Sequence, residues 1–105
     1  MAMIIFPDNT VLCNFASVHR LDLLKEWLRG RGRWTEAVEN EARNSAAYLP
    51  DLVMLLHDRW LGEPIEITDE SSISQIQAIR RSVFGGLPSM PRQHLGEAET
   101  CFIIN

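Results

Sequence analysis

The stretch Met3-Ile4-Ile5-Phe6-Pro7-Asp8-Asn9-Thr10-Val11-Leu12-Cys13-Asn14-Phe15 decides the expected fold. An apolar run ends at Asp8, and an apolar pattern of helical spacing follows it directly. We expect a buried strand over residues 2–7 and a helix over residues 10–18, with Asn9 or Thr10 capping the helix. A carboxylate after such a strand lies at the sheet edge where open α/β folds bind ligands. Asp8 is therefore either a functional carboxylate or a turn-forming residue.

Length and composition indicate one small globular domain over residues 1–105, with 46% hydrophobic and 23% charged residues. The formal net charge of −4 does not favour a nucleic-acid binder, although a cluster of metal-binding carboxylates would itself be acidic. Cys13 and Cys101 have neither zinc-ligand nor disulfide-framework spacing. No segment reaches the apolar length that crosses a bilayer or has the basic flank of a signal peptide. We therefore expect a cytoplasmic protein with no membrane partner.

Helical spacing of apolar residues predicts further helices over residues 20–28, 36–45, 49–60, 70–83 and 94–104. Thr35 and Asp69 are expected to cap two of them. Short strands are expected at residues 33–34 and 64–68. Strands that alternate with helices favour a mostly parallel central sheet covered by helices. The last apolar pattern stops at Asn105 in mid-helix, so we expect a domain that lacks its last strand or strands.

Three carboxylates stand near the ends of the expected elements: Asp8, Glu41 and Glu97. Oxygen ligands of this kind prefer Mg²⁺ or Mn²⁺ over zinc. Clustered carboxylates cannot all stay ionised without a cation, and a divalent ion held by them can activate water for phosphodiester cleavage. Taken alone, Glu41 also fits a solvated helix face, and Glu97 fits the first turn of a helix. Glu99 is the alternative to Glu97, on a different face of the last helix.

Taken in their order along the chain, the segments around Asp8, Glu41 and Glu97 resemble the PIN domain, the small nuclease fold of toxins in VapBC-type toxin–antitoxin systems. Ile4–Leu12 is similar to the family's strand-Asp-x-Asn/Thr-hydrophobic opening, and Leu21–Leu24 comes next. Thr35–Glu41 is similar to its Thr-x-x-Val-x-x-Glu helix, and Leu95–Glu99 to its Leu-Gly-x-Glu-Ala-Glu helix start. The matches run from one end of the chain to the other.

The resemblance implies a PIN-like three-layer α/β/α fold and a Mg²⁺- or Mn²⁺-dependent endoribonuclease. Asp8, Glu41 and Glu97 would be the catalytic, metal-binding acids, with Glu99 as the alternative ligand and Asn9 or Thr10 in support. The implied partners are an RNA substrate, an antitoxin that blocks the acidic groove and a second copy of the chain.

Two features of the chain bear on the implied dimer and on the implied activity. The Leu and Trp positions of residues 49–60 that are exposed offer one surface for the second copy. The family's fourth acid follows a further strand that this sequence does not include. The alternative function is therefore a catalytically incomplete PIN-like module for binding or assembly.

Other site classes fit the sequence less well. A phosphatase with an aspartyl nucleophile needs a second Asp at the position of Thr10. His19, His57 and His94 are too far apart in sequence to suggest a histidine metal site. Six arginines could line a path for an RNA backbone, although each also fits solvated surface: Arg29, Arg31, Arg33, Arg80, Arg81 and Arg92.

Overall fold

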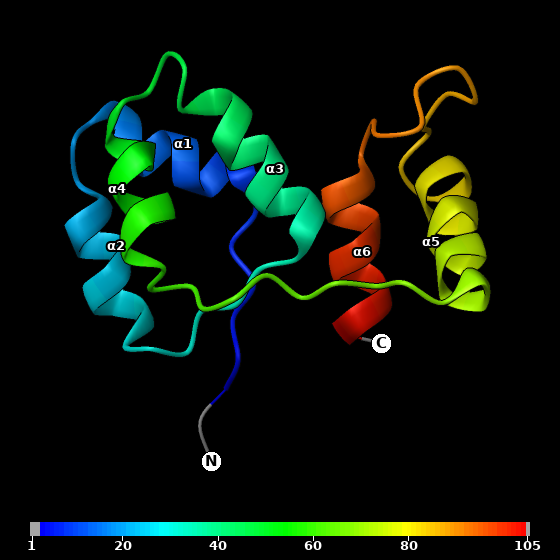
Figure 1. Ribbon diagram of the computed structural model, residues 1–105, viewed down its shortest axis with the longest axis horizontal. Coiled ribbons are helices and arrows are strands. Elements are labelled where there is room, and N and C mark those ends of the chain that lie inside the picture. The colour runs from blue at the N-terminus through cyan, green and yellow to red at the C-terminus, as the bar shows by residue number, and fades with distance from the viewer. Residues whose placement is uncertain (1–2, 105) are drawn as a thin grey trace.

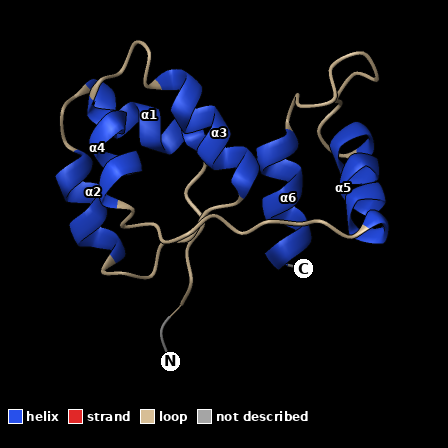
Figure 2. Ribbon diagram, in the orientation of Figure 1, coloured by secondary structure: helices blue, strands red, loops and turns tan. Residues whose placement is uncertain are grey.

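A computed structural model describes residues 3–104, and in this range the regular structure is entirely helical (Figures 1 and 2). The six helices are α1 (Asn9–Ser17), α2 (Leu21–Leu28), α3 (Glu36–Ser45), α4 (Asp51–Asp58), α5 (Glu70–Ser82) and α6 (Leu95–Ile104). All of them lie close to the predicted ranges, because apolar periodicity is a local signal. None of these helices combines the length and the apolar character needed to cross a bilayer.

The predicted PIN-like α/β/α architecture with a central parallel sheet is wrong for the described residues. Extended segments lie where strands were expected, but they pair only at isolated parallel bridges, Ile5 with Gly32 and Thr35 with Ile65. Pro7 and Pro64 flank these contacts and have no N–H to donate, while α3 begins immediately after Thr35. These breaks keep each bridge from growing into a ladder. Residue 2 of the expected first strand lies outside the described range.

Backbone hydrogen bonds nevertheless hold the three extended segments side by side. The Ile5 N–H donates to the Arg31 carbonyl and the Arg33 N–H to the Ile5 carbonyl, both at 2.9 Å. On the other side, the Ile65 N–H donates to the Trp34 carbonyl at 2.9 Å. The first two segments run directly into α1 and α3, so the first turns of these two helices start from neighbouring passages of the chain.

Side-chain caps fix where three helices begin. The Val11 N–H donates to the Asp8 carboxylate at 3.0 Å, so Asp8 caps α1, and the prediction of Asn9 or Thr10 as the cap is wrong. Thr35 and Asp69 cap α3 and α5 as predicted, accepting from the backbone N–H three residues later. Asp8 therefore has a structural role whatever else it does.

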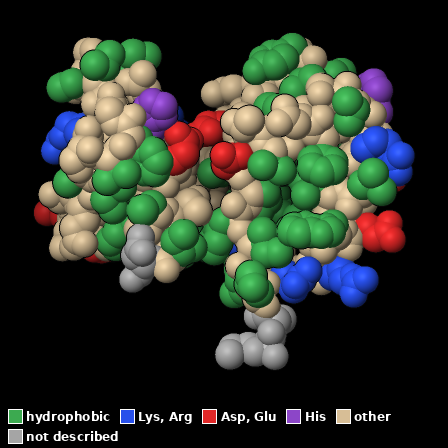
Figure 3. Space-filling model, turned by 180° about the vertical axis from the view of Figure 1, so that it is seen from behind, with side chains coloured by type: hydrophobic (Ala, Val, Ile, Leu, Met, Phe, Trp, Pro, Cys, Tyr) green, Lys and Arg blue, Asp and Glu red, His purple; other side chains and the backbone are tan. Residues whose placement is uncertain are grey.

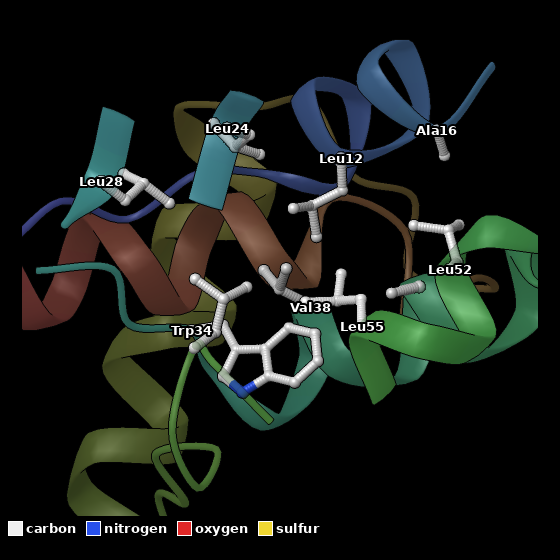
Figure 4. Close-up of a cluster of buried hydrophobic side chains, with 10 residues drawn as sticks. Leu12, Ala16, Leu24, Leu28, Trp34, Val38, Leu52 and Leu55 are labelled. Carbon is white, nitrogen blue, oxygen red and sulfur yellow. The ribbon is translucent and has the colours of Figure 1, made fainter. Parts of the chain in front are cut away.

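A hydrophobic core joins α1 to α4 (Figure 4). At its centre Trp34 is 1% exposed and donates its indole N–H to the Gly62 carbonyl at 2.9 Å. Leu52 and Leu55 are buried in this core, so they are not among the exposed positions of residues 49–60 that we expect to serve a dimer surface. The buried members of the core are Leu12, Ala16, Leu24, Leu28, Trp34, Val38, Ala42, Leu52, Leu55 and Leu61.

The last helix, α6, lies between α3 and α5 (Figure 1). The loop before it is tied to α5 by Arg80, whose side chain is 1% exposed. Its guanidinium donates to the carbonyls of Leu87, Met90 and Gln93 at 3.2, 2.8 and 3.3 Å. Arg80 is buried and makes these hydrogen bonds inside the fold, so the prediction that it contacts an RNA backbone is wrong.

Candidate metal centre

The candidate site is built around Glu41, whose half-buried carboxylate projects from α3 towards the first turn of α6. Burial raises the pKa of Glu41 most, and the negative charge of Glu97 raises it next, with smaller contributions from Asp8 and Glu99. The backbone N–H of Gly96 donates to this carboxylate and acts in the opposite direction. The other three predicted acids therefore all lie close enough to Glu41 for their charges to act on it. Figure 3 shows acidic side chains gathered near the middle of the face that it views.

Gly96 permits this close approach of α6 to α3. A Cβ atom at position 96 would lie 2.6 Å from Glu41 Oε1 and 3.0 Å from Val38 Cγ2. The missing side chain therefore leaves room for the Glu41 carboxylate against the α6 backbone. Glu97 follows directly, which explains why its charge is the one that Glu41 experiences most strongly.

Glu97 is held by His94, a residue that the sequence prediction set aside. His94 Nδ1 lies 2.9 Å from Glu97 Oε2, and the two side chains are 40% and 34% exposed. An exposed pair of this kind contributes little stability, so Glu97 can reorient at small cost. The sequence signal was the three-residue spacing of His94 and Glu97, which places them one helical turn apart.

Glu99 has a different and mainly structural position. Its Oε1 accepts from the Ala37 N–H at 3.1 Å, and the Thr35 hydroxyl also donates to it. Burial raises the pKa of Glu99, and these two hydrogen bonds oppose that rise. Glu99 thus joins α6 to the N-terminal turn of α3 and satisfies one of the N–H groups that a helix start leaves open. Of the two alternatives, Glu97 is the acid that the geometry leaves available as a ligand.

Asp8 and its neighbour Asn9 provide the remaining oxygen atoms of the candidate site. Asp8 is exposed and uses Oδ1 to cap α1. Asn9 Nδ2 donates to Ser45 Oγ at 3.1 Å, and Ser45 lies one helical turn after Glu41 on α3. Asn9 Oδ1 is buried, and within residues 3–104 it has no hydrogen-bond partner. Such an oxygen is costly to leave unmatched, and an external donor or cation would satisfy it. Thr10, the other predicted supporting residue, is exposed.

The chemistry of this donor set fits a hard divalent cation. All the candidate ligands are oxygens, which suits Mg²⁺ or Mn²⁺. Their present arrangement does not close around an ion, since no three His, Cys, Asp or Glu side chains of the described residues converge on one point. Asp8 is at the surface, where it caps α1 through Oδ1, and Glu97 is held only by its exposed pair with His94.

The arginines predicted to contact RNA fall into different environments. Arg31 and Arg33 donate to backbone carbonyls of the turn around Gly30, which fixes their side chains there. Arg92 precedes α6, and its charge lowers the pKa of Glu99. Arg92 is therefore close enough to Glu99 for its charge to act on that carboxylate.

Comparisons of the chain with protein-family models, with curated proteins and with solved structures found no match. The resemblance to PIN domains accordingly depends on the short motifs around Asp8, Glu41 and Glu97. Any assignment of function depends on the chemistry of these residues and on their positions.

Proposed function

We propose that this chain is a Mg²⁺- or Mn²⁺-dependent endoribonuclease of the toxin type, with Asp8, Glu41 and Glu97 as its metal-binding acids. The observation that supports this most strongly is the position of Glu41. A half-buried carboxylate with three other carboxylates around it is unfavourable without a cation, because each negative charge disfavours ionisation of the others. A divalent ion would turn this repulsion into attraction.

The residues around the acids have separable roles in this proposal. A bound ion would supply an activated water and neutralise charge on the scissile phosphate. Glu41 is fixed by the Gly96 N–H, and His94 orients Glu97. Arg92, at the entrance to α6, is the candidate contact for the RNA phosphate. Glu99 maintains the position of α6 on α3.

The proposed partners follow from the same assignment. They are an RNA substrate, an antitoxin protein that blocks the acidic site, and a second copy of the chain, in the cytoplasm. For the second copy, the structure offers the exposed apolar residues Val53 and Met54 on α4, which are 52% and 59% exposed, in place of the buried leucines.

A second candidate function is a binding or assembly module without catalysis. The observation that favours it is the open arrangement of the acids, since no three of the potential ligands in residues 3–104 converge on one point. A module of this kind would keep the contact between α3 and α6 but would not cleave RNA in the presence of Mn²⁺.

The substitution Asp8→Asn distinguishes the two functions. Asn is as good a helix cap as Asp, so the variant keeps α1 but loses the negative charge that a cation needs. We expect at least a hundredfold slower Mn²⁺-dependent cleavage of a single-stranded RNA pool, with an unchanged circular dichroism spectrum.

The matched control is Asp69→Asn, because Asp69 caps α5 in the same way and is also exposed. This variant should cleave at the wild-type rate. Cleavage retained by Asp8→Asn, or lost equally in both variants, would contradict the nuclease assignment.

A further inference from the structure

The segment Met3–Pro7 uses only one of its two backbone edges. Ile5 directs both its N–H and its carbonyl towards residues 31–33. In an extended chain paired in parallel, the neighbouring residues direct theirs to the opposite side. Within residues 3–104 the backbone groups of Ile4 and Phe6 have no hydrogen-bond partner. This segment therefore presents an unpaired edge.

The part of this segment from Ile5 to Pro7 lines an open apolar groove of about 1230 Å³ between α2 and α6. Phe6 and Pro7 contribute to its lining, and both are at least partly buried. Trp27 of α2 and Ile104 of α6 border it and are 63% and 64% exposed. Figure 3 shows this face, with hydrophobic side chains on both sides of a hollow. Exposed apolar residues around an unpaired backbone are typical of a protein-binding surface.

The two ends of the groove carry opposite charges. Asp8 and Glu97 line it at the carboxyl end of the Met3–Pro7 segment. Arg29 and Arg31 line it at the amino end, where the Arg31 carbonyl accepts from the Ile5 N–H, and these two cations outnumber the one carboxylate on α2 that also lines the groove, Glu26. An extended chain bound along the segment would therefore experience a positive field at one end and a negative field at the other.

We infer that this groove binds an extended peptide of a partner protein, which pairs in parallel with the Met3–Pro7 segment. We assign the parallel direction because the segment already pairs in parallel with residues 31–33 and purely parallel sheets are over-represented relative to random expectation. The complementary peptide begins with an acidic residue beside Arg29 and Arg31. It continues with alternating apolar residues and ends with a basic residue beside Asp8 and Glu97. Backbone hydrogen bonds give affinity, and the apolar walls and the charge order give specificity.

Edge-to-edge pairing with a second copy is disfavoured. The Met3–Pro7 segment of that copy would itself be flanked by α2 and α6, so the helices of both copies would have to be accommodated before the two backbones came within the distance of about 2.9 Å that hydrogen bonds require. A single extended peptide can enter, since paired chains lie only about 4.8 Å apart.

Synthetic peptides test this site on the full chain without any metal, so the result is independent of the proposed nuclease activity. The probe is the acetylated and amidated peptide Glu-Val-Thr-Val-Thr-Val-Lys, titrated into ¹⁵N-labelled protein. We expect saturable shifts of the Ile4 and Phe6 amide resonances. The peptide with Glu and Lys exchanged should bind at least fivefold more weakly. N-methylation of alternate peptide residues should abolish binding for one set of positions and not for the other.

Two variants of the protein locate the contact. Trp27→Gln should weaken binding about tenfold by removing an apolar wall of the groove. Val18→Gln is the matched control, because Val18, the residue that ends α1, is an apolar residue outside the groove with the same 63% exposure as Trp27, and this variant should bind like wild type. Equal affinity for both charge orders, indifference to both sets of N-methyl groups, or self-association in place of peptide binding would overturn the inference.

Discussion

The carboxylate of Glu41 lies where its negative charge is least favourable in the absence of a cation. Burial and the charges of Glu97, Asp8 and Glu99 all favour the protonated form, and a single N–H from Gly96 favours the ionised form. Residues in such an environment are common at functional sites, although structural networks also produce them. The resulting electrostatic destabilisation of the folded state can be measured in the protein without metal.

Glu41→Gln should therefore stabilise the metal-free protein at pH 7. The pKa values of Glu41 and Glu99 are raised above the ordinary 4.5, so the folded state binds more protons than the unfolded state just above pH 4.5. Stability consequently falls as the pH rises through the raised pKa values and stays lower above them. We expect the variant to melt roughly 2–4 °C higher than wild type at pH 7, after allowance for solvent screening, and close to wild type at pH 4.

Thermal melts followed by circular dichroism at both pH values check this expectation. The control is Glu39→Gln, on the same helix, where Glu39 forms an ion pair with Arg43 at 3.2 Å. This variant should gain no stability at pH 7. A Glu41→Gln protein that melts below wild type at pH 7 would show that the carboxylate is not destabilised by its neighbours.

At the scale of elements, the helices could be predicted from the sequence and the sheet could not. Leu12 and Ala16 on α1, or Leu24 and Leu28 on α2, recur at helical spacing, which is information contained in each segment. The extent of strand pairing depends on contacts between distant segments. Those contacts stop at Ile5 and Ile65, because prolines and a helix start interrupt them.

The contact between α3 and α6 is the element-scale feature on which the site depends. Gly96→Ala tests it because the expected sign is unusual. Alanine inside a helix ordinarily stabilises by up to about 1 kcal/mol relative to glycine. Here the added Cβ would lie 2.6 Å from Glu41 Oε1, whose carboxylate is half-buried and accepts from the Gly96 N–H, and 3.0 Å from Val38 Cγ2, so we expect a loss of about 1–3 kcal/mol in the free energy of unfolding.

Urea denaturation measures this loss, and a double-mutant cycle assigns it. In a Glu41→Ala background the oxygen that meets the new methyl group is gone, so Gly96→Ala should cost less there. Some penalty should remain, because Val38 Cγ2 would lie 3.0 Å from the same Cβ. A stabilised Gly96→Ala protein, or strict additivity in the cycle, would contradict the close contact.

At the scale of the whole molecule, the fold brings together acids that are far apart in the sequence. Asp8 precedes α1, Glu41 is on α3 and Glu97 is on α6, which lies between α3 and α5. The sequence could indicate these residues because each follows a recognisable motif. It could not show that Glu99 binds the Ala37 N–H while Glu97 faces Glu41, because that distinction depends on how α6 packs against α3.

The most direct test of the central claim is a calorimetric titration of Mn²⁺ into the wild type and the Asp8→Asn variant at pH 7. A metal centre predicts one saturable site in the wild type and at least tenfold weaker binding in the variant, because the cation loses one of its charged ligands. Asp69→Asn, which removes an equivalent capping carboxylate from α5, should bind Mn²⁺ like the wild type. Identical isotherms for the wild type and Asp8→Asn would contradict the metal site.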